Sequence, residues 1–269
     1  MTAGAAALIV SAAAQVAGAR PARADDTVAA PDRRLHVPLT LALGGIYLLA
    51  EAPFKGPLSK DTCRWCGPIL VDDAVRDALL WGDRHLAHDL SNWSGFVTAP
   101  LFALGGIGLA AHLDDRRGNW FDDGLVIAEA AAIAGVTNFV IKAAVARERP
   151  FVHQLAPEDK PRTDRPQDNN QSFYSGHATL TMSLAVSAGT VASMRGYRWA
   201  PALWGGGVGL SLATGYLRIA ADKHWTTDVV TGWVLGAAIG YAVPRFLHRR
   251  GTEVAPIATG STVGVAMTW

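Results

Sequence analysis

Six apolar stretches, separated by polar segments, occupy most of the chain. They lie at residues 37–52, 96–113, 125–146, 178–194, 201–219 and 229–247. Each is long enough for a helix, so the pattern predicts an all-α protein built as a six-helix bundle. A bilayer-spanning helix needs roughly 20 mainly apolar residues, and several stretches barely reach that length. The pattern therefore predicts a membrane-associated bundle and leaves a soluble helical bundle open.

The two ends of the chain have different patterns. An apolar stretch at 3–19 precedes Ala22-Arg23-Ala24, a small-x-small site typical of an exported chain, although an uncleaved anchor remains an alternative. At the other end, the apolar side chains between Val263 and Trp269 alternate with small and polar ones after Gly260-Ser261, which predicts a β-hairpin packed on the helices. We therefore divide the chain into a targeting segment (1–24), a single helical domain (25–250) and a hairpin tail (251–269).

Two long polar segments interrupt the helices. The segment 147–176 is rich in Pro, Asp, Asn and Gln, and long loops in compact domains are often functional. Within 53–93, apolar residues recur at helical spacing between Val71 and Leu80, which predicts a short surface helix at 72–81.

Composition narrows the function. Half of the residues are hydrophobic, 17% are charged and the formal net charge is +1, so the basic surface of a nucleic-acid-binding protein is missing. Any anion must therefore meet a local cluster of cations. Of the histidines outside the motifs, His36, His112 and His248 are expected to face solvent or an interface.

The only cysteines form a Cys63-Arg-Trp-Cys66 pair. In an exported chain such a pair predicts a disulfide, on the same side of the bundle as the loops described next. Two alternatives stay open: a zinc site completed by His85 and His88, and a redox-active dithiol.

The first motif that could form part of a functional site is a pair of cations. Lys142 and Arg149 are seven residues apart, about two helical turns, so both are expected on one helix face where the third helix ends at Pro150. A basic helix end that complements the helix dipole is the ordinary explanation. A lysine inside an apolar stretch costs more than that explanation requires, which favours a functional site.

The second motif is Tyr174-Ser175-Gly176-His177, directly before an apolar helix. A helix start with Ser and Gly presents N–H groups and a hydroxyl to an anion, with a histidine beside it. A Ser N-cap alone would explain Ser175 but neither neighbour.

The third motif joins the last two helices and contains Arg218, His224 and Asp228. A carboxylate four residues after a histidine can hold one ring nitrogen and leave the other free to attack. The three motifs are predicted to meet, because the third and fifth helices end, and the fourth and sixth begin, on one side of the bundle.

Together these motifs resemble the signature of the type 2 phosphatidic acid phosphatase and vanadium haloperoxidase superfamily. The signature reads Lys-x6-Arg-Pro, Pro-Ser-Gly-His and Ser-Arg-x5-His-x3-Asp; here Tyr174 replaces its proline and Leu217 the serine before the arginine. The resemblance runs from the third helix to the sixth.

The resemblance implies a six-helix fold of the phosphatidic acid phosphatase type and a metal-independent phosphatase without a cofactor. His224 would attack phosphorus, Asp228 would hold its imidazole, and His177 would protonate the leaving alcohol. The phosphate oxygens would be bound by Lys142, Arg149, Arg218 and the N–H groups at Ser175 and Gly176. Three cations suit this chemistry, because phosphoryl transfer needs mostly positioning and charge stabilisation.

The expected substrate is a phosphorylated lipid or a small phosphate ester. A soluble periplasmic acid phosphatase of broad specificity is the alternative, followed by a vanadium haloperoxidase and a non-catalytic membrane scaffold with an anion pocket. A pocket that only binds needs no nucleophile, which argues against the scaffold.

Positive charge predicts the orientation. The loops opposite the motifs carry the arginines at 33, 34, 116, 117, 195, 198, 249 and 250, and such loops tend to be cytoplasmic. The expected location is therefore the bacterial cell envelope, with the active site in the periplasm and the body either embedded in the membrane or wholly periplasmic.

Overall fold

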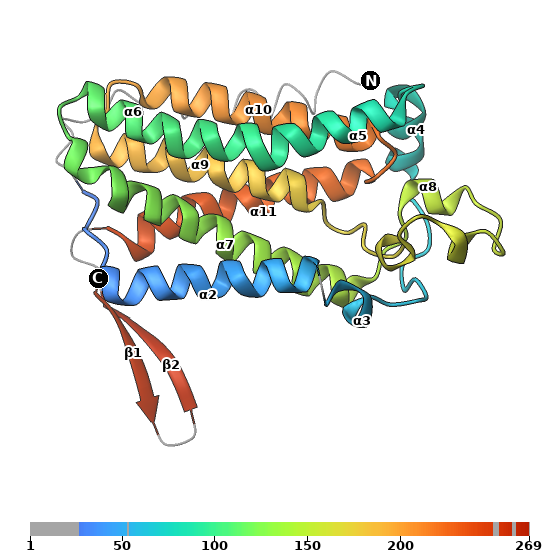
Figure 1. The fold of residues 1–269 in the computed structure, drawn as a ribbon, viewed down its shortest axis with the longest axis horizontal. Coiled ribbons are helices and arrows are strands. Elements are labelled where there is room, and N and C mark those ends of the chain that lie inside the picture. Colours follow the sequence, from blue (N-terminus) through green and yellow to red (C-terminus); the bar gives the residue numbers. More distant parts are fainter. Residues whose placement is uncertain (1–26, 53, 250–252, 260–261, 269) are drawn as a thin grey trace.

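A computed structural model describes residues 27–52, 54–249, 253–259 and 262–268. Long helices run alongside one another and dominate the fold (Figure 1). They are α2 (Arg33–Glu51), α5 (Arg84–Trp93) continuing into α6 (Gly106–Leu113), α7 (Trp120–Val145), α9 (Gly176–Arg195), α10 (Ala200–Ala220) and α11 (Thr226–Ala242). Each apolar stretch of the sequence falls largely within one of these helices, and the chain is mostly helical as expected.

Short elements fill the connections. They are α3 (Lys55–Leu58), α4 (Leu70–Leu79), α8 (Pro150–His153) and the 3₁₀ turns at Arg117–Asn119, Lys160–Arg162 and Pro166–Asp168. The helix α4 matches the predicted short helix at 72–81, but it is not purely a surface element. Its Asp72 is fully buried and Arg76 is 8% exposed.

The helix from α5 to α6 is continuous but wider in its middle. Two π-helical segments, Ser94–Thr98 and Leu101–Gly105, lie on either side of Pro100. Proline lacks the N–H that an α-helix requires, and π-bulges are one way in which a helix accommodates such a defect. The first of these segments lies beside α9 and carries Gly95 against the ring of His177.

Helix α9 lies in the middle of the bundle, between α10 and the pair α7 and α11 (Figure 1). Its contact with α11 is made through Gly232, Gly236 and Gly240. A Cβ at these positions would lie within 3.0 Å of a carbonyl oxygen of α9, from Ser175, Thr179 and Ser183 respectively. The glycines therefore let the two backbones touch, which fixes the start of α11 against the start of α9.

Three helical segments are long and apolar enough to cross a membrane: Arg84–Leu113, Arg117–Val145 and Thr226–Leu247. Large apolar side chains also point outward from the bundle, among them Leu41, Leu48, Leu101 and Val234, each more than 60% exposed. Apolar surface on this scale indicates a lipid or protein environment rather than water. The protein is accordingly membrane-associated.

The tail forms two antiparallel strands, β1 (Glu253–Thr259) and β2 (Thr262–Thr268), with Glu253 opposite Thr268 and Thr259 opposite Thr262. The hairpin extends away from the helices (Figure 1), so the expectation that it packs on the helical body is wrong. The proposed targeting segment at 1–24 lies outside the described residues.

Candidate functional site

The three sequence motifs meet at the end of the bundle where α3, α4 and α8 lie, on the right in Figure 1. Helices α7 and α10 end there, and α9 and α11 begin there. The backbone N–H of Ser175 donates to the carbonyl oxygen of Asp228 at 3.0 Å, which ties the second motif to the third. The predicted convergence is therefore present in the structure.

The ring of His224 is buried at the centre of the third motif. It is 2% exposed and lies in the turn between α10 and α11, ahead of Thr226, where α11 begins. Its Nδ1 donates to the carbonyl oxygen of Ser172 at 2.8 Å. Nε2 is thus the ring nitrogen left for reaction.

The expected direct hydrogen bond from His224 to Asp228 is not formed. Nδ1 is 3.8 Å from Asp228 Oδ2, and that oxygen instead accepts from Ser172 Oγ at 2.5 Å and from the backbone N–H of Trp225 at 3.0 Å. The helical spacing argument fails because His224 precedes the helix. Asp228 is instead linked to the imidazole through Ser172, whose hydroxyl donates to Asp228 and whose carbonyl oxygen accepts from His224.

Arg147, which the motif analysis did not single out, organises this support. Its guanidinium is fully buried and donates to Asp228 Oδ1 and Asp72 Oδ2, both at 2.6 Å. It also stacks over Trp65 at 3.8 Å from the ring centroid. Arginine suits such a position because its planar fork serves two carboxylates and an aromatic face at once. In the sequence, Arg147 is marked only by its position two residues before Arg149, a residue of the first motif.

The cations come from three elements. Helix α7 ends at Val145, where Ala146 is left-handed (φ 49), so the prediction that the helix continues to Pro150 is wrong. Arg149 is extended (ψ 153), as expected for a residue before proline. The Nζ of Lys142 nevertheless lies 3.3 Å from where a Cβ on Gly176 would be, directly at the start of α9.

Arg149 and Arg218 are each held from one side. Arg149 Nε donates to the carbonyl oxygen of Asp168 at 2.8 Å. Arg218 Nη1 donates to Ser91 Oγ at 3.0 Å, while its buried Nε has no partner among the described residues. An unpaired buried donor on an arginine is costly and fits a site that receives an anion.

The positive charges lie close enough to the imidazole of His224 to change its pKa. Burial lowers the pKa of His224 well below its ordinary 6.5, and Arg149 and Arg218 lower it further. Burial and the same two arginines lower the pKa of Lys223 to about 8. Burial alone would raise the pKa of Asp168, but Arg149 and Lys55 outweigh it and bring that pKa to about 2. The site is strongly positive around a neutral imidazole.

The start of α9 differs in detail from the prediction. Ser175 is the N-cap, its Oγ accepts from the N–H of Ala178 at 3.5 Å, and its own N–H is taken by Asp228. The N–H groups without an intrahelical acceptor are those of Gly176 and His177. A cradle for phosphate at this helix start would therefore use Gly176 and His177 rather than Ser175 and Gly176.

His177 is positioned by helix α5, a contribution that the sequence did not reveal. Its Nε2 donates to Asn92 Oδ1 at 2.9 Å, which leaves Nδ1 as the nitrogen that can exchange a proton. Phe96 packs on the ring at 4.5 Å between centroids. Asn92 follows Ser91, the partner of Arg218, so one turn of α5 supports both residues.

The cysteines lie at the same end of the bundle. Cys63 and Cys66 are joined in a disulfide, and the N–H of the intervening Arg64 donates to the carbonyl oxygen of Ala146 at 3.0 Å. His88, one of the residues of the zinc alternative, instead lies 3.1 Å from Arg218 Nη1. In the described part of the chain these residues form no metal-ligating group.

Comparison with known proteins agrees with the motifs. Residues 123–252 match the PAP2 superfamily. Among solved structures, the chain is similar to the first transmembrane PAP2 type phosphatidylglycerolphosphate phosphatase from Bacillus subtilis, at 16% sequence identity and a TM-score of 0.47. That match covers 77% of this chain and 93% of the other.

Proposed function

From the match of residues 123–252 to the PAP2 superfamily, we propose that this protein is a metal-independent phosphatase acting on a lipid phosphate or diphosphate. The observation that carries the proposal is a buried, neutral imidazole whose Nδ1 is held by a carbonyl group while Lys142, Arg149 and Arg218 surround it. A site that only binds anions gains nothing from a nitrogen nucleophile.

In the first step, His224 Nε2 attacks phosphorus, the N–P bond forms and the bond to the leaving oxygen breaks. Nδ1 keeps its proton and remains hydrogen-bonded to the carbonyl oxygen of Ser172, which stabilises the positive charge that develops on the ring. His177 gives a proton to the leaving oxygen. The cations bind the three other oxygens, on which most of the negative charge is spread.

In the second step, the oxygen of a water molecule attacks phosphorus and the N–P bond to His224 Nε2 breaks. His177 takes a proton from the water, and phosphate and the neutral imidazole of His224 are released. Preorganised donors cost no reorganisation during either step, and removing one typically costs about 2.7–4 kcal/mol of barrier. The three cations thereby do the work that metal ions do in other phosphoryl-transfer enzymes.

A lipid substrate follows from the position of the site. The catalytic loops lie at one end of a bundle with apolar sides, which is where a headgroup would be found if the helices stand in a bilayer. The arginines at the other end favour the cytoplasm for that end, so we place the catalysis in the periplasm.

The orientation can be tested with two exposed positions at opposite ends, Arg165 and Gly118. Cysteine placed at Arg165 should react in intact cells with a membrane-impermeant thiol reagent that passes the outer membrane. Cysteine at Gly118 should react only after the inner membrane is opened. The reverse pattern would place the site in the cytoplasm.

The activity is tested by phosphate release from a panel of lipid phosphates, lipid diphosphates and soluble esters. We expect release from lipids, no loss in EDTA, inhibition by orthovanadate as a mimic of the transition state, and no activity in a folded His224→Ala variant. His85→Ala, at an exposed position, is the control. Preference for soluble esters would favour the acid phosphatase alternative, and dependence on magnesium would refute the mechanism.

A further inference from the structure

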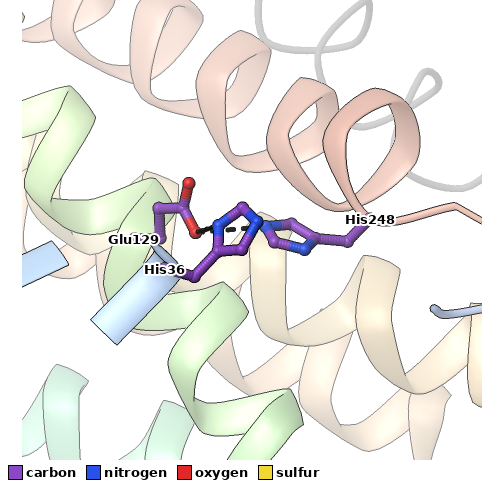
Figure 2. A group of neighbouring side chains, drawn as sticks. All are labelled: His36, Glu129 and His248. Atoms are coloured by element: carbon purple, nitrogen blue, oxygen red, sulfur yellow. Dashed lines mark hydrogen bonds and ion pairs between the residues drawn. The ribbon is translucent and has the colours of Figure 1, made fainter. Parts of the chain in front are cut away.

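A second cluster of ionisable side chains lies in the core, away from the catalytic loops. His36 of α2, Glu129 of α7 and His248, directly after α11 and its π-helical extension (Val243–Leu247), come together there (Figure 2). Their exposures are 7%, 1% and 1%. The prediction that His36 and His248 face solvent or an interface is therefore wrong, whereas His112 is exposed as expected.

The three groups converge on one atom. Glu129 Oε2 is 2.9 Å from His36 Nδ1 and 3.1 Å from His248 Nε2, and one carboxylate oxygen faces both rings in Figure 2. The two imidazoles lie 4.6 Å apart between centroids. All three possible ligand atoms fall within 4.8 Å of one another.

This cluster cannot serve the phosphatase site directly. Glu129 precedes Lys142 by 13 residues (142 − 129) on the continuous helix α7. At 1.5 Å per residue that separation is about 20 Å. The cluster lies toward the other end of the bundle, where α2 begins and the last helix ends.

The charge of Glu129 calls for a cation. Its neighbours Val126, Ile127 and Ala130 on α7 are fully buried, and an unpaired carboxylate in such surroundings is expensive. In the described part of the chain, its ion pairs are with the two histidines, which carry charge only when protonated. A divalent metal would supply the charge with both rings neutral.

The ligand set and spacing suit a particular class of metal. Two imidazoles and a carboxylate are typical of zinc and similar divalent transition metals, whereas magnesium and calcium prefer oxygen ligands. Ligands about 2.0–2.1 Å from a tetrahedral metal are roughly 3.3–3.5 Å apart. The two contacts of Glu129 Oε2, at 2.9 and 3.1 Å, would have to lengthen by roughly 0.2–0.6 Å to reach this spacing.

We propose that His36, Glu129 and His248 bind one zinc-type divalent cation that joins α2 and the segment directly after Val243–Leu247 to α7. The backbone around His248 is already fixed for this role. Its carbonyl oxygen accepts from the N–H of Ala29 at 2.8 Å, and Val28 pairs with Arg249 in an isolated β-bridge. The cation links segments more than 200 residues apart (248 − 36 = 212) and stabilises the folded chain without touching the substrate.

The test must separate metal binding from a network of hydrogen bonds. Asparagine at position 36 can place an amide N–H near the position of Nδ1, and glutamine at position 248 can place one near that of Nε2. The double variant His36→Asn/His248→Gln thus retains donors to Glu129 but loses both metal ligands. His112→Asn, at an exposed histidine, is the matched control.

Purified protein without a histidine tag is loaded with zinc, desalted and analysed for metal, and its unfolding is followed by tryptophan fluorescence. We expect about one zinc per chain, and at hundredfold excess over Kd a rise in Tm on the order of 5–10 °C that EDTA reverses and magnesium does not produce. The double variant should bind no zinc and unfold near the temperature of the metal-free wild type. The His112→Asn protein should behave as wild type.

Wild-type protein that retains no zinc would overturn the proposal, and so would zinc binding that survives the double substitution. If the double variant does not fold, Glu129→Gln, which keeps the shape and removes the charged ligand, replaces it with the same expected loss of zinc. Phosphate release at 25 °C should not change with EDTA, because the cluster is about 20 Å from Lys142.

Discussion

Replacing Arg147 by glutamine should destabilise the protein strongly and disable the nucleophile. The guanidinium is fully buried and pairs at 2.6 Å with Asp72 and Asp228, which are fully buried too. Removing one partner of a buried ion pair costs about 3–5 kcal/mol, because a buried charge is left without compensation. For a chain of this size that corresponds to a fall in Tm of roughly 6–20 °C.

The control is Arg162→Gln, the same substitution in an exposed ion pair. Arg162 is 77% exposed on its side chain and lies 3.6 Å from Asp159, and such pairs contribute about 0–1 kcal/mol. Both variants are compared in detergent by thermal unfolding and by kcat/KM at a temperature where both are folded. A Tm for the Arg147 variant within 2 °C of the control would refute the account of Arg147 as the organiser of this site.

Three further predictions concern the catalytic end. The decrease of kcat/KM on the acid side should have its midpoint below pH 6.5, because the lowered pKa keeps His224 of the free enzyme neutral down to that pH. The ionisation of the substrate near pH 6 is measured separately, and a midpoint above 6.5 would contradict the lowered pKa of His224. His177→Ala should slow alkyl phosphates far more than aryl phosphates, whose leaving groups need less acid assistance; equal losses would remove His177 as the acid. Gly232→Ala should cost about 1–3 kcal/mol of stability and lower activity, because its Cβ would be 2.8 Å from the carbonyl oxygen of Ser175, whereas Gly209→Ala, with open space, should be neutral.

The sequence predicted the composition of the site better than its internal contacts. The order of the motifs and the alternation of helix ends were enough to bring Lys142, Arg149, Arg218 and His224 together. Patterns along the chain cannot show that α7 stops at Val145 or that His224 precedes its helix, because both depend on backbone geometry in the turns. The direct bond to Asp228 was therefore predicted and is absent.

Residues that act through tertiary contacts were missed for a different reason. Asp72 and Arg147 are 75 residues apart, and neither belongs to a recognisable pattern. Asn92 lies in a helix that was expected to begin only at residue 96. A buried pair of this kind becomes visible only once the helices are placed, because burial, not spacing, gives such residues their importance.

The two ends of the bundle bury charge of opposite sign. At the catalytic end, buried cations exceed the acids facing them, and the surplus of positive charge fits a dianionic phosphate. At the other end, Glu129 is a buried carboxylate whose partners are histidines, and its deficit of positive charge fits a divalent cation. Helix α7 carries Lys142 near its C-terminal end and Glu129 nearly four turns earlier, and it also buries Asp122, Asp123 and Asn138. Charge inside such a helix is expensive, and the phosphate and the divalent cation that we propose would each supply a charge opposite to that of the buried residue.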